Sequence, residues 1–295
     1  MSSGVTRFAP AKVNLFLHVG DRRPDGYHDL KSLAVFAGVG DTLSVEPADK
    51  ISLTLKGPAA PGLEVDERNL VMKAARALDD WAQYNGHSTR GAQITLYKHL
   101  PLASGIGGGS SDAAAALQLL KAHWTLPIDP KDLGRIALSV GADVPVCLRA
   151  EASWMSGTGE LVEPAPHLPP FYLVLVNPGV PVSTADVFRG LQVRSGAFAP
   201  AMPSKLKLRD FVGWLDRTVN DLSAPARLIA PAIMQAENAL VATEDCLLAR
   251  MSGSGATCFG IYPDERTAKL AASQIRSSNP TWWVECGRQL DQPSS

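Results

Sequence analysis

Hydrophobic and polar residues alternate along the first part of the chain. The segments 12–19 (KVNLFLHV), 41–47 (DTLSVEP) and 51–57 (ISLTLKG) follow a two-residue period, which is typical of strands that bury one face. The later segment 91–100 (GAQITLYKHL) has the same character and runs directly into a glycine-rich stretch. The pattern therefore predicts a β-rich start, with one further strand leading into that stretch.

Other segments carry apolar residues three or four positions apart, which predicts helices. In 67–84 one predicted helical face consists of Leu70, Ala74, Ala77 and Trp81. In 110–124 the predicted stripe consists of Ala113, Leu117, Leu120 and Trp124. Because most other positions of this second segment are apolar too, we expect its helix to be buried. A third helix is predicted in 129–141, where an Asp-Pro pair gives a start signal and the final glycine an end signal.

The clearest change in composition is the segment 164–170 (PAPHLPP), which has four prolines in seven residues. It predicts a boundary between two domains, 1–163 and 164–295. The elements expected beyond it are strands in 171–179 and 281–287, a strand–glycine turn–strand unit in 246–262, and helices in 184–191, 205–216, 230–243 and 264–278. This mixed order, with antiparallel neighbours, favours the α+β class.

Composition narrows the class of protein. The 295 residues are 45% hydrophobic and 19% charged, and the formal net charge is −1. Nucleic acids and anionic membranes favour strongly basic surfaces, so neither is an expected partner. The four cysteines are scattered without a CxxC pair, which favours free thiols over zinc ligands or disulfides. The sequence shows no secretion signal and no apolar run of roughly 20 residues, so we expect a cytoplasmic protein.

The segment 101–117 (PLASGIGGGSSDAAAAL) carries the strongest chemical signal. It contains neither the Gly-Lys-Ser/Thr of a Walker loop nor a dinucleotide-binding GxGxxG unit. Glycines followed by a helix still favour phosphate binding, because the backbone can approach the anion and the helix N-terminus offers unpaired N–H groups. The hydroxyls of Ser110 and Ser111 could donate to phosphate or bind a bridging Mg²⁺. The alternative is an ordinary turn in which one of these serines is the helix N-cap.

This segment resembles the phosphate-binding motif of the GHMP kinase superfamily. Four further motifs support the resemblance in order along the chain: 9–32 with its Asp-Gly-Tyr-His element, GADVPVCL (141–148), VNDL (219–222) and MSGSGATCFGIY (251–262). The GGGSSDAA form resembles the branch that phosphorylates the 2-hydroxyl of 4-diphosphocytidyl-2-C-methyl-D-erythritol in the non-mevalonate isoprenoid pathway. The resemblance implies a two-domain fold, with 1–163 binding ATP–Mg²⁺ and 164–295 as the C-terminal domain. We expect a monomer or a weak homodimer.

The resemblance also implies catalytic roles for Asp143 and Lys12. Asp143 would be the base for the acceptor hydroxyl, and Lys12 would pair with it and stabilise the transferring phosphate. Each charge would compensate the burial of the other. Taken alone, an aspartate after Ala-Gly is typical of a helix cap, and a lysine at a strand start is typically solvated.

Binding roles follow from the same resemblance. The residues expected to bind ATP are Leu102, Ala103, Ser104, Gly105, Ile106, Gly107, Gly108, Gly109, Ser110, Ser111, Asn69 and Lys98. The residues expected to bind the cytidine-diphosphate sugar alcohol are Asn14, Tyr27, His28, Thr184 and Phe188. An aromatic pair would stack on the base and the imidazole would bond its edge. The sequence assigns no metal ligands.

Two other hypotheses stay open at this stage. A GHMP kinase for a small acyclic acceptor would share the glycine loop but have no base to stack on aromatic rings. A nucleotide- or RNA-binding module would keep the fold and bind ATP without transferring phosphate. For Gly253 and Gly255 a purely structural turn and a turn close to the active site are equally compatible with the sequence.

Overall fold

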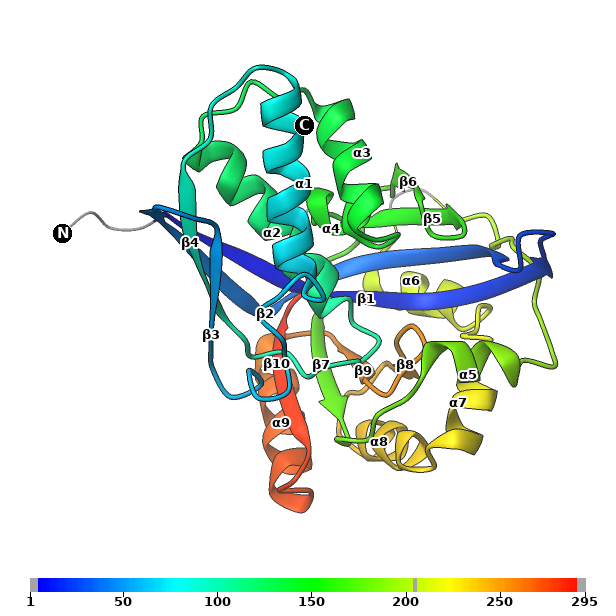
Figure 1. Cartoon of the computed structure of the whole chain (residues 1–295). Helices are drawn as coiled ribbons and strands as arrows, with labels where there is room; N and C mark the ends of the chain where they lie inside the picture. The colour runs from blue at the N-terminus through cyan, green and yellow to red at the C-terminus, as the bar shows by residue number, and fades with distance from the viewer. Residues whose placement is uncertain (1–4, 204–205, 291–295) are drawn as a thin grey trace. The chain divides into compact units, whose positions relative to one another are not determined.

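The structure is a computed structural model that describes residues 5–203 and 206–290, and Figure 1 shows its elements. They form two compact units. The first contains the described residues up to Ala11 with 40–102 and 107–149, and the second contains 12–39, 103–106 and the described residues from 150 onward. This division differs from the expected boundary after residue 163, because strands β1 (Val5–Arg22) and β2 (His28–Ala48) each contribute to both units.

The first unit combines antiparallel and parallel strand pairs with four helices. Strand β4 (Gly91–Tyr97) pairs antiparallel with residues 42–48 of β2, and parallel with β3 (Ser52–Lys56). The helices of this unit are α1 (Leu70–Tyr84), α2 (Gly108–His123), α3 (Pro130–Val140) and α4 (Val144–Arg149). Helix α2 packs against the other three (Figure 1). Most of its side chains are buried, as its apolar sequence predicts.

The second unit holds a four-stranded antiparallel sheet in the order β10-β7-β9-β8. Its strands are β7 (Tyr172–Asn177), β8 (Leu248–Met251), β9 (Cys258–Tyr262) and β10 (Trp283–Arg288). Residues 30–34 of β2 pair in the same unit with β5 (Ser153–Gly157), which pairs with β6 (Leu161–Pro164). The strand order is therefore mixed, and the α+β class is confirmed.

Five helices of the second unit follow β6 in the chain. They are α5 (Thr184–Arg189), α6 (Leu208–Leu215), α7 (Ser223–Ile229), α8 (Ala232–Val241) and α9 (Glu265–Ser278). Helix α8 packs on β8 and β9, and α9 packs on β7 and β10 (Figure 1). Burying both helices against the sheet creates the apolar core of this unit.

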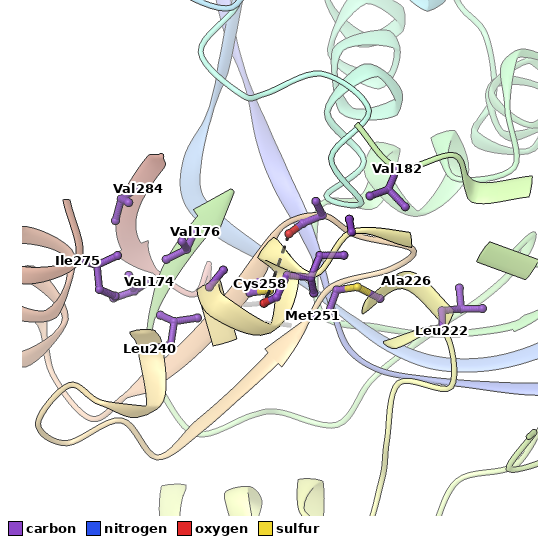
Figure 2. Close-up of a cluster of buried hydrophobic side chains, with 14 of the residues drawn as sticks. Val174, Val176, Val182, Leu222, Ala226, Leu240, Met251, Cys258, Ile275 and Val284 are labelled. Atoms are coloured by element: carbon purple, nitrogen blue, oxygen red, sulfur yellow. Dashed lines mark hydrogen bonds between the residues drawn. The ribbon is translucent and has the colours of Figure 1, made fainter. Parts of the chain in front are cut away.

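Cys258 lies inside that core, among side chains from the sheet and its helices. Figure 2 shows the valines of β7 and β10 with Leu240 and Ile275 on one side of Cys258, and Ala226 and Leu222 on the other. Burial raises the pKa of the Cys258 thiol well above its usual value. All four cysteines are free thiols, as the sequence predicts, although Cys246 and Cys286 are only half-buried.

Most predicted elements are present. Helices α4 and α7 and strands β5 and β6 were not predicted. In α1 the predicted residue Ala74 is fully buried, but Leu70, Ala77 and Trp81 are only half-buried. The other fully buried residues are Val71, Ala75, Leu78 and Ala82, so the buried face is rotated by about one position from the predicted one. Residue 205, at the start of the predicted helix 205–216, lies outside the described residues. Within 5–203 and 206–290, no helix is long and apolar enough to cross a membrane.

Candidate active site

The glycine loop has a backbone suited to anions. Ala103, Gly105 and Gly107 have φ values of +46°, +73° and +61°, so left-handed residues occur at every second position. Such alternation turns successive N–H groups toward a common concave side. Helix α2 begins at Gly108, and Gly107 is its N-cap without any side-chain cap. The first N–H groups of this long, buried helix therefore have no intrahelical acceptor and can bind a phosphate.

The two serines of the loop have different surroundings. The buried Ser111 hydroxyl donates to the carbonyl of Pro10 at 2.6 Å. Ser110 is half-buried, and its hydroxyl has no hydrogen bond within the part of the chain that the structure describes. Neither serine is the N-cap, so that alternative is wrong. The geometry leaves the hydroxyl of Ser110, rather than that of Ser111, available to a ligand.

The glycine loop packs directly on the second glycine-rich motif in the second unit. A Cβ on Gly105 would lie 2.5 Å from the carbonyl oxygen of Ser252 and 2.8 Å from the backbone of Gly255. A Cβ on Gly253 would lie 2.8 Å from the Gly105 oxygen. The N–H of Thr257 donates to the carbonyl of Ser104 at 3.1 Å. The glycines of 252–255 are therefore needed for close backbone contact with the phosphate loop.

Replacing Gly105 with alanine should lower kcat/KM for ATP by about 100-fold or more, because the new Cβ has no room and the positive φ is strained. Steady-state kinetics with varied ATP measures this change. Gly134→Ala in α3 is the matched control, since a Cβ there meets nothing within 4 Å. The control should keep wild-type kinetics and gain about 0.5–1 kcal/mol of stability. Equal kinetics for both variants would contradict the tight packing at Gly105.

Lys12 and Asn14 lie on β1 in the second unit, and both are buried. Lys12 is 4% exposed, so the expectation of a solvated lysine is wrong. Its N–H donates to the carbonyl of Ile106 at 2.9 Å, which ties the strand to the glycine loop. The Asn14 amide nitrogen donates to the hydroxyl of Ser32 at 2.7 Å, and that hydroxyl donates to Phe16. This chain of donors fixes the orientation of the Asn14 amide.

Asp143 precedes α4 in the first unit and is half-buried. Its carbonyl accepts from the N–H of Cys147 at 3.2 Å, and the next residue, Val144, donates to Gly141 at 3.0 Å. The aspartate thus stands at the start of a short helix, where a cap is expected. Lys12 and Asp143 belong to different units, and their pairing stays a prediction from the sequence.

The Asp-Gly-Tyr-His turn brings His28 and Phe188 together in the second unit. Their rings stack with centroids 5.8 Å apart and an interplanar angle of 24°. The Nδ1 of His28 lies 3.1 Å from the carbonyl oxygen of Gly20 and must donate to it, because a carbonyl only accepts. The Nε2 atom is then left to bond a ligand. Tyr27 is 66% exposed and its ring is accessible.

Thr184 begins α5, and its hydroxyl lies 2.8 Å from that of Ser254. The glycine motif 252–255 therefore contacts Thr184, a residue predicted to bind the acceptor substrate, as well as the phosphate loop. Asn220 of the VNDL motif donates to the carbonyls of Met251 and Gly253, which holds this motif in place.

Asn69 and Lys98, which are predicted to contact ATP, have structural roles in the first unit. Asn69 is the N-cap of α1: its side-chain oxygen accepts from the N–H of Val71, and its amide donates to Glu64. Lys98 is buried, and its ammonium group lies 2.6 Å from a carboxylate oxygen of Asp41 and 2.6 Å from one of Asp112. Contacts of Asn69 and Lys98 with ATP remain predictions.

The cluster of Lys98, Asp41 and Asp112 holds one positive and two potentially negative groups. One carboxylate oxygen of Asp41 also accepts from the N–H groups of His99 and Leu100, at 2.6 and 2.8 Å. Burial and the neighbouring Asp41 charge, opposed by Lys98, raise the pKa of Asp112 to about 8. The sequence did not single out Asp41, because nothing local marks it as a partner of Lys98.

Comparison with known proteins shows the family of this chain. The family described as "GHMP kinases N terminal domain" matches residues 69–151, and the family described as "GHMP kinases C terminal" matches residues 208–281. A protein of Paramagnetospirillum magneticum named 4-diphosphocytidyl-2-C-methyl-D-erythritol kinase is 51% identical over 94% of this chain and 95% of its own length. The chain belongs to the GHMP kinases. It is an ATP-dependent kinase.

Two solved kinase structures have the same fold as this GHMP kinase. A crystal structure of 4-(cytidine 5'-diphospho)-2C-methyl-D-erythritol kinase is 32% identical, with a TM-score of 0.75 over 97% of this chain and 99% of that one. A homoserine kinase from Cytophaga hutchinsonii has a TM-score of 0.70 over 99% and 96% of the two chains. At 18% identity the second likeness shows the fold alone.

Proposed function

We propose that this kinase transfers the γ-phosphoryl group of ATP to the 2-hydroxyl of 4-diphosphocytidyl-2-C-methyl-D-erythritol, in non-mevalonate isoprenoid biosynthesis. The observation that carries the proposal is the His28–Phe188 stack, with Tyr27, whose side chain is exposed, preceding His28 in the chain. Flat rings with a free imidazole nitrogen suit a pyrimidine base, which can stack and hydrogen-bond at one edge. The names of the similar kinases support the same substrate.

The glycine loop 102–111 would hold the phosphates of ATP. Backbone N–H groups of the loop and of the α2 N-terminus would donate to phosphate oxygens, with the Ser110 hydroxyl beside them. Asn69 and Lys98 would lie near the adenine. Both already use their side chains within the protein, so backbone contacts are the simplest form of this role.

The donor set at the loop also fits a metal held chiefly by phosphate. Across 5–203 and 206–290, no cluster of three or more His, Cys, Asp or Glu side chains could hold a metal ion. The Ser110 hydroxyl is the loop side chain that remains available, and hydroxyls with phosphate oxygens are suitable Mg²⁺ ligands. Bound Mg²⁺ would offset the phosphate charge during transfer.

In the proposed reaction Asp143 accepts the proton of the acceptor 2-hydroxyl. The freed oxygen attacks the γ-phosphorus, and the bond from that phosphorus to the bridging oxygen of ADP breaks in line. Lys12 would stabilise the negative charge on the transferring group. Asn14 and Thr184 would hold the sugar alcohol or its diphosphate through their polar side chains.

The test is ADP release from purified protein with Mg²⁺–ATP and a panel of acceptors. Turnover with the cytidine substrate, and not with mevalonate, homoserine or galactose, is the expected result. Turnover with another acceptor would keep the kinase and reject the base-binding role of His28 and Phe188. Bound ATP without ADP release from any acceptor would favour a binding module.

We also propose a cytoplasmic location and a monomeric or weakly dimeric state, as the sequence predicts. Sedimentation at several protein concentrations measures the oligomeric state directly. A stable higher oligomer would contradict this part of the proposal.

A further inference from the structure

The backbone N–H groups of Lys12 and Asn14 lie on the same edge of β1, the edge next to the glycine loop. The N–H of Lys12 donates directly to the loop carbonyl of Ile106 at 2.9 Å. The N–H of Asn14, two residues on, points the same way because alternate residues of a strand face the same side. It donates instead to the side-chain oxygen of Ser252, at 3.1 Å.

The Ser252 hydroxyl passes this interaction on to the loop. Its own proton is donated to the carbonyl oxygen of Gly105 at 3.0 Å, next to the residue that Lys12 contacts. The sequence of bonds is Asn14 N–H to Ser252 Oγ, then Ser252 O–H to Gly105 carbonyl. One serine side chain thus takes the place of a direct backbone bond between β1 and the loop.

The position of Ser252 leaves little freedom for a substitute. The residue is fully buried, with 0% of its surface exposed. Its backbone oxygen faces Gly105, and its N–H donates to the carbonyl of Thr257 at 2.9 Å. Removing the hydroxyl would leave the Asn14 N–H and the Gly105 carbonyl without this partner, in a place with no access for bulk water.

We propose that Ser252 is a positioning residue for phosphoryl transfer, whose hydroxyl sets the register between the phosphate loop at Gly105 and the strand that carries Lys12. The inference rests on the proposed phosphate role of the loop and the proposed catalytic role of Lys12. It assigns to one side chain of the C-terminal glycine motif a task that its glycines cannot perform. Ser252 itself touches neither substrate in this account.

Loss of the Ser252 hydroxyl should not disturb the side chain of Asn14, which is proposed to bind the acceptor substrate. The Asn14 side chain is held separately, by its hydrogen bond to Ser32 and by a contact of its amide nitrogen with the Met155 sulfur at 3.9 Å. Loss of the Ser252 hydroxyl should therefore move the loop relative to Lys12 while the Asn14 amide stays in place. An effect on the loop without an effect on Asn14 would distinguish a positioning role of Ser252 from a general loss of stability.

The experiment compares Ser252→Ala with Ser153→Ala in the full-length protein. Ser153 is the matched control, because it is also fully buried and its hydroxyl donates to one backbone carbonyl, that of Glu151, at 2.8 Å. For Ser252→Ala we expect kcat/KM for ATP to fall about 10- to 100-fold, since misplacement by about 1 Å costs about this much. The KM for the acceptor should stay within about threefold of wild type. Ser153→Ala should leave both KM values unchanged.

Direct binding and a milder variant complete the test. Calorimetric titration should show weaker ATP binding by Ser252→Ala than by wild type. Ser252→Cys keeps a side chain of similar size with a weaker donor. Its ATP affinity should therefore lie between those of wild type and Ser252→Ala. If the alanine variant does not fold, the cysteine variant carries the same comparison.

Two results would overturn the inference. One is a folded Ser252→Ala protein whose ATP affinity and kcat lie within about twofold of wild type. The other is a loss of activity with both KM values and ATP affinity unchanged, which would indicate only a smaller active fraction. If the wild-type protein phosphorylates no cytidine acceptor, the proposed function fails, whereas the difference in ATP affinity between wild type and variant still decides the role of Ser252.

Discussion

Replacing Asp143 with asparagine should lower kcat by about 10²- to 10⁴-fold, the usual contribution of a general base. The carboxylate would accept the proton of the acceptor hydroxyl, and an amide cannot do so. KM for ATP should change little, because the phosphates would be held by the glycine loop. Turnover under saturating substrates, together with ATP titration, measures both quantities.

This substitution distinguishes a catalytic role of Asp143 from a role as a helix cap only. The residue stands at the start of α4, and asparagine caps helices about as well as aspartate. If Asp143 were only a cap, Asp143→Asn would keep wild-type turnover and the base assignment would be wrong. Thermal melting should give nearly the same transition for both proteins, so a large loss of kcat cannot be attributed to unfolding.

Lys12→Met provides the second half of the comparison. Methionine keeps most of the buried stem and removes the charge. If the two residues act on one transferring group, the double variant should lose little more activity than the worse single variant, because residues that act as a unit are not additive. Fully multiplicative losses would contradict a shared role.

The long elements could be predicted from the sequence because their periods extend over several turns or pleats. Helices α2 and α3 and strands β1 and β4 are examples. Helices α4 and α7 span only 6 and 7 residues, which is less than two full turns. Each also has a proline near its start, which is compatible with a first turn but resembles a break. Short helices of this kind leave no recognisable period.

The site could be predicted only where its residues belong to a local motif. The glycine loop and the Asp-Gly-Tyr-His turn are such motifs, and each carries its chemistry within a few residues. Ser252 and Asn14 are 238 positions apart, and Lys98 and Asp41 are 57 apart. No spacing rule joins such pairs, because the folded backbone alone brings them together. Lys98 shows the consequence: its place near the glycine loop is evident from the sequence, and its buried carboxylate partners are not.

Replacing Lys98 with methionine should destabilise the protein by about 3–5 kcal/mol, since it removes one partner of a buried charge cluster. Asp41 would keep its two backbone donors and lose its only cationic partner within the described residues. Lys269→Met is the matched control. Lys269 lies 2.6 Å from Glu265, the same distance as in the buried pair, but both of its groups are largely exposed. The control should lose at most about 0.5 kcal/mol.

The destabilisation by Lys98→Met should also depend on pH. The ammonium group of Lys98 lowers the pKa of the buried Asp112 carboxyl, so its removal should raise that pKa in the folded variant above the wild-type value of about 8. Around and above pH 8 the folded variant then binds more protons than folded wild type, so its deficit in unfolding free energy should shrink as the pH falls from about 10 to about 7. Urea denaturation at several pH values measures this deficit. A deficit that is small, or that grows toward acid pH, would show that burial does not make this cluster depend on its one lysine.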